Sequence, residues 1–347
     1  MTPTFGVEEE FMLVDRHGRL SDASAAVLAD APPADGELQP ELVRCQVESA
    51  SPVCTGADEL LHHLRTQRAQ LAKAADRHGL RLLPSGSAPQ PEAGRRRLTP
   101  GDRYADMADH FGNLLNSVNI CGCHVHVAIP DASAGIHVLN HLRRWLPILL
   151  ATSANSPFTE GRDSGYASWR HQSMSLWPTA GPPPHFDSPE HYRATVNTLL
   201  STGAIVDERM VYWDVRLSPT HPTVEVRVCD VAPTAEEAVA YAVLIRALAT
   251  RALDEPPIPT EAVQAALWRA GRDGLTGQCP DPATGRTVAA TTFLRRLVDH
   301  VRPVLQPGVE SYVDRLGCGD PAGRQRAAYA RRGRFTDVVD LLAGPPS

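Results

Sequence analysis

The chain has 347 residues, of which 42% are hydrophobic and 21% are charged, and its formal net charge at pH 7 is −6. This composition is typical of a globular protein with a sizeable core, and the acidic balance gives no electrostatic basis for binding nucleic acid or an anionic membrane. The longest apolar run, Trp145 to Ala154, is too short to cross a bilayer.

The first predicted strand, Phe5 to Val14, carries three consecutive carboxylates. Because side chains alternate between the faces of a strand, Glu8 and Glu10 share one face and Glu9 points to the other. Two carboxylates on one face repel each other unless a cation or protons lie between them, and such pairs build oxygen-ligand sites for Mg²⁺ or Mn²⁺. The alternative is a polar strand face in contact with solvent.

The pattern then alternates between extended and helical segments. A second extended run, 42–48, ends at Ser51-Pro52 and carries Glu48 near its end. Asp58 is a good N-cap for the amphipathic helix that follows. The remaining expected elements of this part are a helix over 58–78, a short strand over 80–84, a loop over 88–100, a helix over 102–115, a strand over 117–129 and a helix over 133–151.

Within the strand over 117–129, the run Cys-Gly-Cys-His-Val-His looks at first like a zinc site. Alternation argues against it, because His124 and His126 share one face while Cys121 and Cys123 face the other way. The thiols are therefore predicted to be buried core groups. The two histidines suit contact with a metal or a phosphate, and the alternative is that they are hydrogen-bonded polar residues of the core.

A segment rich in Gly, Pro, Ser and aromatic residues spans 155–189, and loops of this length are usually functional or disordered. Its tryptophans, histidines and arginine favour a functional loop. Arg170 is the candidate to hold a substrate carboxylate through a bidentate pair, and His126, His171 and Trp177 are candidates for polar and stacking contacts. A structural role for Arg170 is the alternative.

Two strands follow, over 211–217 and 223–231. Alternating valines define the core face of the second strand, so Glu225 and Arg227 project together from the opposite face. A solvent-exposed ion pair is the simpler explanation of this arrangement. The remainder of the chain is predicted to be mostly helical. The mixed connections favour one α+β domain, 1–347, with a largely antiparallel sheet.

Two features favour a cytoplasmic protein. No basic segment followed by an apolar stretch is visible near the N-terminus, so no secretory signal is predicted. The seven cysteines lack the spacing of a disulfide framework.

Lys73 is the only lysine, so phosphate groups handled by this protein would be neutralised by arginines and metal ions.

Taken together, the motifs resemble the bacterial glutamate–cysteine ligase type 2, or carboxylate–amine ligase, family. The resemblance runs from Phe5 to about Arg326, and the order of the motifs is more specific than any single one. They are Gly6-Val7-Glu8-Glu9-Glu10-Phe11, Val47-Glu48 with Ser51-Pro52-Val53, Gly122-Cys123-His124-Val125-His126, Ser153-Ala154-Asn155-Ser156-Pro157-Phe158, Glu225-Val226-Arg227-Val228-Cys229-Asp230 and the segment 319–326.

The resemblance implies a fold similar to the catalytic domain of glutamine synthetase, a curved antiparallel sheet with helices on its outer side. It also implies a reaction in which ATP phosphorylates a carboxylate and an amine attacks the acyl phosphate, giving an amide, ADP and phosphate. The expected substrates are a small carboxylate, such as glutamate or an analogue, and a small amine or amino acid. The expected cofactors are ATP and two or three Mg²⁺ ions, which Mn²⁺ can replace. A homo-oligomer is left open.

The resemblance assigns roles residue by residue. Arg227 would contact the transferring phosphate, and Arg324 and Arg326 would hold ATP phosphates. Glu41 is a further candidate ligand. The expected metal ligands are Glu8, Glu10, Glu48, His124 and Glu225.

Two other functions compete with this one. A metal-dependent amide hydrolase would use the same carboxylates and histidines to activate water, and it would need no nucleotide. A non-catalytic binding protein could retain the fold. The predominance of carboxylates over soft ligands disfavours a zinc hydrolase, and the presence of all five expected ligands disfavours a protein that has lost catalysis.

Overall fold

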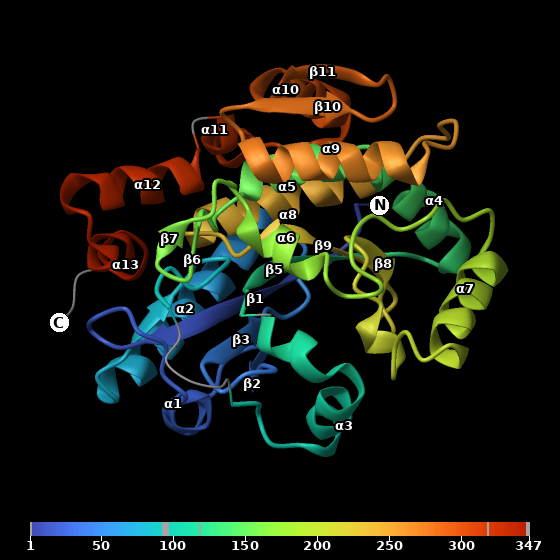
Figure 1. Cartoon of the computed structure of the whole chain (residues 1–347). Coiled ribbons are helices and arrows are strands. Elements are labelled where there is room, and N and C mark those ends of the chain that lie inside the picture. The colour runs from blue at the N-terminus through green and yellow to red at the C-terminus, as the bar shows by residue number, and fades with distance from the viewer. Residues whose placement is uncertain (1, 92–96, 118, 318, 345–347) are drawn as a thin grey trace.

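The computed structural model describes residues 2–91, 97–117, 119–317 and 319–344. In this part of the chain, seven strands form an antiparallel sheet in the order β2-β3-β1-β5-β9-β8, with β4 paired to β1 (Figure 1). The strands of this sheet are β1 (Phe5–Val14), β2 (Glu37–Pro40), β3 (Gln46–Ala50), β4 (Arg81–Leu83), β5 (Gly122–Ala128), β8 (Val215–Leu217) and β9 (Thr223–Asp230). The short pairs are β6 (Phe158–Thr159) with β7 (Arg162–Asp163), and β10 (Gln278–Asp281) with β11 (Arg286–Ala289).

Helices cover one face of the sheet. Among them, α8 packs on β1 and β5, α5 on β9, and α2 on β1 and β4. The helices are α1 (Ser24–Asp30), α2 (Ala57–Arg77), α3 (Asp102–Phe111), α4 (Ala132–Leu142), α5 (Leu146–Ser153), α6 (Trp169–Met174), α7 (Pro189–Ser201), α8 (Ala235–Thr250), α9 (Thr260–Asp273), α10 (Ala290–Val301), α11 (Glu310–Gly317), α12 (Pro321–Arg332) and α13 (Phe335–Ala343). Short 3₁₀-helices span Gly112–Ser117, Glu208–Met210 and Arg302–Val304.

The core lies between the sheet and these helices. Val125 of β5 and Val226 of β9 are paired in register and fully buried beneath the helices. Helix α8 is apolar on nearly every side, which suits a helix in the interior, and the Thr234 hydroxyl caps its start by accepting a hydrogen bond from the Glu237 N–H at 3.2 Å. The opposite face of the sheet carries the polar members of each alternating pair and is free to form a site.

The predicted α+β architecture with an antiparallel sheet is confirmed. The helix expected over 133–151 is two helices, because Pro147 lacks a backbone N–H and its ring clashes with the carbonyl four residues earlier. The segment 155–189 is not a plain loop, since it contains β6, β7 and α6. Helix α1 and strand β2 lie in a stretch where no element was expected, and both are short. None of the helices that the structure describes has the length and hydropathy needed to span a bilayer.

Candidate active site

A cavity of about 810 Å³ lies on the face of the sheet opposite the helices. Its floor is formed by polar side chains of β1, β3, β5 and β9, and its walls by α3, α6 and the segments around residues 36–53 and 209–223. Such a volume can hold a nucleotide-sized ligand. The cavity therefore collects the polar face of four strands into one place.

Strand register brings the predicted residues together. Glu8 of β1 is opposite His124 of β5, and Glu10 of β1 is opposite Glu48 of β3. His126 of β5 is opposite Glu225 of β9. All five expected metal ligands line the cavity, together with His126.

Glu9 lies on the other face of β1, as alternation predicts. It is fully buried, and its two carboxylate oxygens accept hydrogen bonds from Arg68 of α2 at 2.9 and 2.5 Å. The charge of Glu9 is thus paired within the helix layer. This assigns Glu9 to the fold, whereas Glu8 and Glu10 face the cavity.

The first donor group consists of Glu10, Glu41 and Glu48, each of which contributes a carboxylate oxygen within 4.8 Å of the others. Burial and the nearby charge of Glu41 raise the pKa of Glu10 to about 7. The same two causes raise the pKa of Glu48 well above its usual range. Three carboxylates at this spacing need protons or a cation to offset their repulsion, and oxygen-rich groups are the ligands that Mg²⁺ and Mn²⁺ prefer.

The second donor group consists of Glu8, His126 and Glu225, again within 4.8 Å of one another. The ring atom His126 Nε2 lies 3.2 Å from Glu8 Oε1 but is buried without a hydrogen-bond partner among the described residues. Its other ring nitrogen, Nδ1, is 2.8 Å from the Thr223 hydroxyl, which fixes the orientation of the ring. A buried nitrogen without a partner is available to a cation.

His124 lies between the two donor groups. Its Nδ1 is 3.2 Å from Glu8 Oε2, and its Nε2 is 3.6 Å from Glu10 Oε1. Burial and the charge of Arg227 lower the pKa of His124 to about 4, so the ring is neutral at pH 7. Its Nε2 is also buried without a hydrogen-bond partner in the described part of the chain. The donor sets thus fit divalent ions, with the two histidines and the carboxylates of both groups as ligands.

Arg227 is the cation nearest to these carboxylates. Its Nη1 contacts a carboxylate oxygen of Glu225 and lies 3.3 Å from His124 Nδ1. Burial disfavours the charged guanidinium, but the charges of Glu225 and Glu10 outweigh it and raise the pKa of Arg227. Arg216 of β8 holds Glu225 from the other side, with Nε and Nη2 donating to its two oxygens at 2.7 and 3.1 Å. Glu225 is therefore ionised, and Arg227 is fixed at the edge of both donor groups.

Three candidates from the segment 155–189 also line the cavity. Arg170 is buried, and its Nη2 donates to the Arg227 carbonyl at 3.0 Å, which leaves Nε without a partner among the described residues. His171 Nε2 lies 3.3 Å from a carboxylate oxygen of Asp214. Trp177 packs edge-on against Tyr212. Substrate contact by these residues stays a prediction, and much of the hydrogen-bonding capacity of Arg170 is directed toward β9.

The structure does not bring Arg324 and Arg326 into this cavity. Both are on α12, where Arg324 donates to Glu237 of α8 at 2.5 Å and Arg326 pairs with Asp163 at 2.8 Å. Neither is among the cavity-lining residues. Their contact with ATP stays a prediction, and this geometry does not support it.

Sequence reasoning missed several residues of the cavity wall. Gln39 of β2 donates to Glu48 Oε1 at 3.1 Å. The guanidinium carbon of Arg227 lies over the ring of Tyr212, 5.9 Å from the centre of that ring. Arg103 of α3 is held by Asp207 at 2.7 Å. Gln39 belongs to a four-residue strand, and Arg103 belongs to a helix that the sequence predicts without assigning it a role. Nothing in their local sequence placed them at the site.

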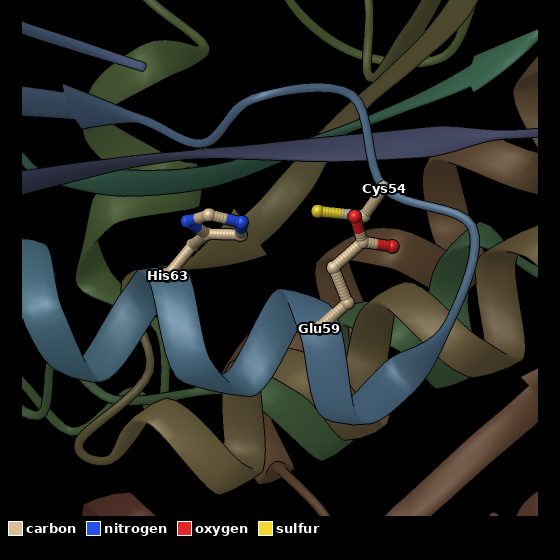
Figure 2. Close-up of side chains that lie close together, drawn as sticks. All are labelled: Cys54, Glu59 and His63. Atoms are coloured by element: carbon tan, nitrogen blue, oxygen red, sulfur yellow. The ribbon is translucent and has the colours of Figure 1, made fainter. Parts of the chain in front are cut away.

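A third donor group, Cys54, Glu59 and His63, lies outside the cavity. Figure 2 shows Glu59 and His63 projecting from one side of α2 toward Cys54, which precedes the helix. Glu59 accepts hydrogen bonds from Thr55 and Gly56 as part of the cap of α2. Burial and the charge of Glu59 raise the pKa of Cys54 to about 11, which disfavours a thiolate ligand. Helix capping accounts for the position of Glu59 without a metal.

Cys121 and Cys123 are fully buried, as predicted, and burial raises the pKa of both thiols. We expect their replacement by alanine to lower the free energy of unfolding by about 2–4 kcal/mol through lost packing. We also expect the rise in melting temperature caused by Mg²⁺ to be unchanged. Glu48→Gln is the matched control that should reduce this rise. A folded double variant that no longer responds to Mg²⁺ would instead make the thiols part of the metal site.

The acidic cavity makes stability depend on pH in a predictable direction. The pKa of Glu10, raised from 4.5 to about 7, means that the folded state retains a proton that the unfolded state has already released. In a chelating buffer, the free energy of unfolding should therefore fall by about 3 kcal/mol between about pH 4.5 and pH 7 on account of this group. Denaturant unfolding across this range, with and without Mg²⁺, measures the effect. Mg²⁺ should restore most of the lost free energy of unfolding at neutral pH. The prediction would be contradicted if the free energy of unfolding varied with pH in the same way with and without Mg²⁺.

The chain is similar to known proteins over nearly its whole length. Residues 4–335 match the family model described as Glutamate-cysteine ligase family 2. A relative from Rhodococcus jostii, named "Putative glutamate--cysteine ligase 2-1", is 47% identical over 97% of this chain and 95% of its own length. A relative from Mycolicibacterium smegmatis, "Putative glutamate--cysteine ligase 2-3", is 43% identical over 98% of this chain and 97% of its own.

Two solved structures share the fold. A glutamate–cysteine ligase from Francisella tularensis, crystallised with AMP, has a TM-score of 0.71 at 12% identity, over 99% of this chain and 88% of the other. A bifunctional glutathione synthetase from Pasteurella multocida has a TM-score of 0.68 at 16% identity, over 98% of this chain and 52% of that longer one. Both confirm the predicted fold class.

Proposed function

We propose, since this chain belongs to glutamate–cysteine ligase family 2, that it forms an amide bond between a small carboxylate and an amine through an acyl phosphate. ATP would phosphorylate the carboxylate, and the amine would then displace phosphate. The products would be the amide, ADP and phosphate. The observation that carries this proposal is the convergence of two acidic donor groups, two buried histidines and Arg227 in one cavity.

The chemistry requires this kind of cavity. A carboxylate and the ATP phosphates repel each other, so their charges must be offset before an oxygen of the carboxylate can attack the γ-phosphorus. Glu10, Glu41 and Glu48 would hold one divalent ion, and Glu8, His126 and Glu225 another, with His124 able to serve either. Bound ions would neutralise the phosphates and orient them.

Arg227 would stabilise the phosphoryl group during transfer. Its guanidinium stays charged at every physiological pH, and Glu225 and Tyr212 fix its position. A planar group with several donors suits the three equatorial oxygens of the transferring phosphoryl group. Neither step requires a nucleophile from the protein, so the burial of the cysteines away from the cavity is consistent with the route.

The substrates follow in outline. Glutamate or an analogue is the proposed acyl donor, and a small amine or amino acid is the proposed acceptor. Arg170, His171 and Trp177 line the part of the cavity formed by the segment 155–189, and they would contact these substrates. Family membership and the carboxylate-rich donor groups favour a ligase over the hydrolase and over a non-catalytic binding protein.

Incubation of the purified protein with ATP, Mg²⁺, glutamate and pooled amines tests the proposal, with ADP and new products read by mass spectrometry. We expect ADP release that depends on the amine, together with a product whose mass is the sum of both substrates minus water. Amide cleavage without ADP in the presence of Mn²⁺ or Zn²⁺ would support the hydrolase instead.

A further inference from the structure

A second pocket, of about 350 Å³, lies away from the candidate active site and shares no lining residue with it. It is formed by α4, by residues 185–187 ahead of α7, and by the segment 253–258 that joins α8 to α9. Helices α4 and α7 lie in contact with each other (Figure 1). Its volume is at the lower end of the range for small-molecule sites.

Arg143, at the end of α4, lines this pocket and is the unusual residue in it. It is only 1% exposed, its hydrogen-bond acceptors among the described residues are neutral oxygens, and the carboxylate charge that acts on it, that of Glu261, forms no direct ion pair with it. Its Nε donates to the Pro183 carbonyl at 2.9 Å and its Nη2 to the Thr260 hydroxyl at 3.1 Å. No hydrogen bond joins Nη1 to the described residues, and this atom is not among the fully buried nitrogens that lack a partner. Burial lowers the pKa of Arg143 to about 10, which still leaves it charged at pH 7.

This situation is costly for a protein, because a buried charge is normally compensated by a counter-ion. Arg216 follows that rule by pairing with Glu225, whereas Arg246 of α8 is buried against neutral acceptors. Arg143 resembles Arg246 in this respect but differs from it in lining a pocket. Its unpaired Nη1 is therefore placed to receive the anionic group of a ligand.

Three carboxylates also line the pocket, and each has a partner within the chain: Asp254 contacts His137, Asp187 contacts His191, and Glu255 pairs with Arg144. Asp187 and Asp254 line the pocket with side chains that are 81% and 100% exposed, and Glu255 lines it with 25% exposure. His185 also lines the pocket, with its Nε2 4.0 Å from a carboxylate oxygen of Asp187, and burial and the charge of Arg143 lower its pKa. No three donors of this pocket form a metal-binding group among the described residues. A ligand would thus meet a cation in the interior and carboxylates at the rim.

The remaining wall is apolar, formed by Ile136, Phe186, Leu253 and Ile258 together with two prolines. We propose that this pocket binds an amino acid with an apolar side chain. Its carboxylate pairs with Arg143 Nη1, its ammonium group faces Asp187, Asp254 and Glu255, and its side chain contacts the apolar wall.

The pocket is connected to the candidate active site through Arg143. Arg143 donates to the carbonyl of Pro183, which follows Pro182 in the chain. It also donates to the hydroxyl of Thr260, the first residue of α9, and this helix carries Gln264 one turn later. Pro182 and Gln264 both line the larger cavity. An effect of the bound amino acid on turnover would rest on the proposed function, whereas its binding does not.

Calorimetric titration of the whole chain tests the proposal with leucine and two analogues, each of which lacks one of the two charges of leucine. Leucine carries both charges, N-acetylleucine lacks the ammonium group, and leucinamide lacks the carboxylate. We expect saturable binding of leucine and binding about tenfold weaker for each analogue, because each loses one charged contact.

Two variants assign the binding to this pocket. Arg143→Met should weaken leucine and N-acetylleucine about tenfold while leaving leucinamide unchanged. Asp254→Asn should weaken leucine and leucinamide about twofold while leaving N-acetylleucine unchanged. Arg193→Gln, which removes an exposed arginine of α7 paired with Glu190, is the control that should change nothing.

Because Asp254 is fully exposed, its variant should fold even where Arg143→Met does not, and it then decides the result with the two analogues. Absence of saturable leucine binding to the wild-type chain would overturn the proposal. So would leucine binding that is the same in the wild type and in Asp254→Asn, since that binding would belong to another site.

Discussion

Arg227→Lys is expected to reduce ADP formation by about 10³-fold while Mg²⁺ binding changes little. Lysine keeps the positive charge beside Glu225, so the neighbouring carboxylates remain compensated. It lacks the planar fork that reaches several phosphate oxygens at once, and the loss of one such preorganised contact typically costs about 10²–10³ in rate. Single-turnover ADP formation measures the phosphoryl-transfer step directly.

Arg103→Lys is the matched control for this change. Arg103 also lines the cavity but pairs with Asp207, which does not line it. We expect its variant to keep the rate of ADP formation within about tenfold of the wild type. Near-normal ADP formation by Arg227→Lys would remove Arg227 from the transferring phosphate.

The second large effect is expected from neighbouring positions of β1. Glu10→Gln should lower turnover by about 10²–10³-fold, because it removes a charged ligand from the first donor group. The same variant should stabilise the metal-free chain by about 2–3 kcal/mol at pH 7, since it removes a buried carboxylate whose pKa is raised to about 7. Loss of activity with a gain of stability is the pattern expected at a functional site.

Glu9→Gln should do the opposite. It removes the negative charge that compensates Arg68, and leaving one partner of a buried ion pair without the other typically costs about 3–5 kcal/mol of stability. The folded fraction should still bind Mg²⁺, because Glu9 faces the helices. Denaturant unfolding with and without Mg²⁺ compares the two variants. Equal effects on Mg²⁺ binding would contradict the assignment of the two faces.

The period of two along the strands explains why the sequence predicts so much of the site. Alternation alone separates Glu9 from its neighbours and separates Cys123 from His124, and the structure confirms both. The roles of the two histidines are less well predicted. His126, expected to contact substrate, lies in a donor group with Glu8 and Glu225, and His124 lies between the groups.

Residues brought in from outside the strands were beyond this reasoning. Glu41 lies between β2 and β3, and its approach to Glu10 and Glu48 depends on how that connection packs. Arg324 and Arg326 show the reverse case. Their segment resembles the family, but the side chains of α12 reach carboxylates on other elements. Arg324 donates to Glu237 of α8, and Arg326 donates to Asp163 of β7.

Helix boundaries also depended on tertiary structure. A continuous apolar pattern over 133–151 predicts one helix, and the break appears only when Pro147 is considered with the carbonyl of Arg143. That break places Arg143 at the end of α4, where its side chain is buried beside the second pocket.

The most direct test of the proposed acyl phosphate is the fate of the carboxylate oxygen. The acyl donor, labelled with ¹⁸O in its carboxylate, is incubated with ATP, Mg²⁺ and the amine, and the released phosphate is analysed by mass spectrometry. The proposed route transfers one ¹⁸O atom to phosphate in every turnover, since the amine displaces the phosphorylated oxygen. Phosphate without ¹⁸O, released together with amide product, would contradict it.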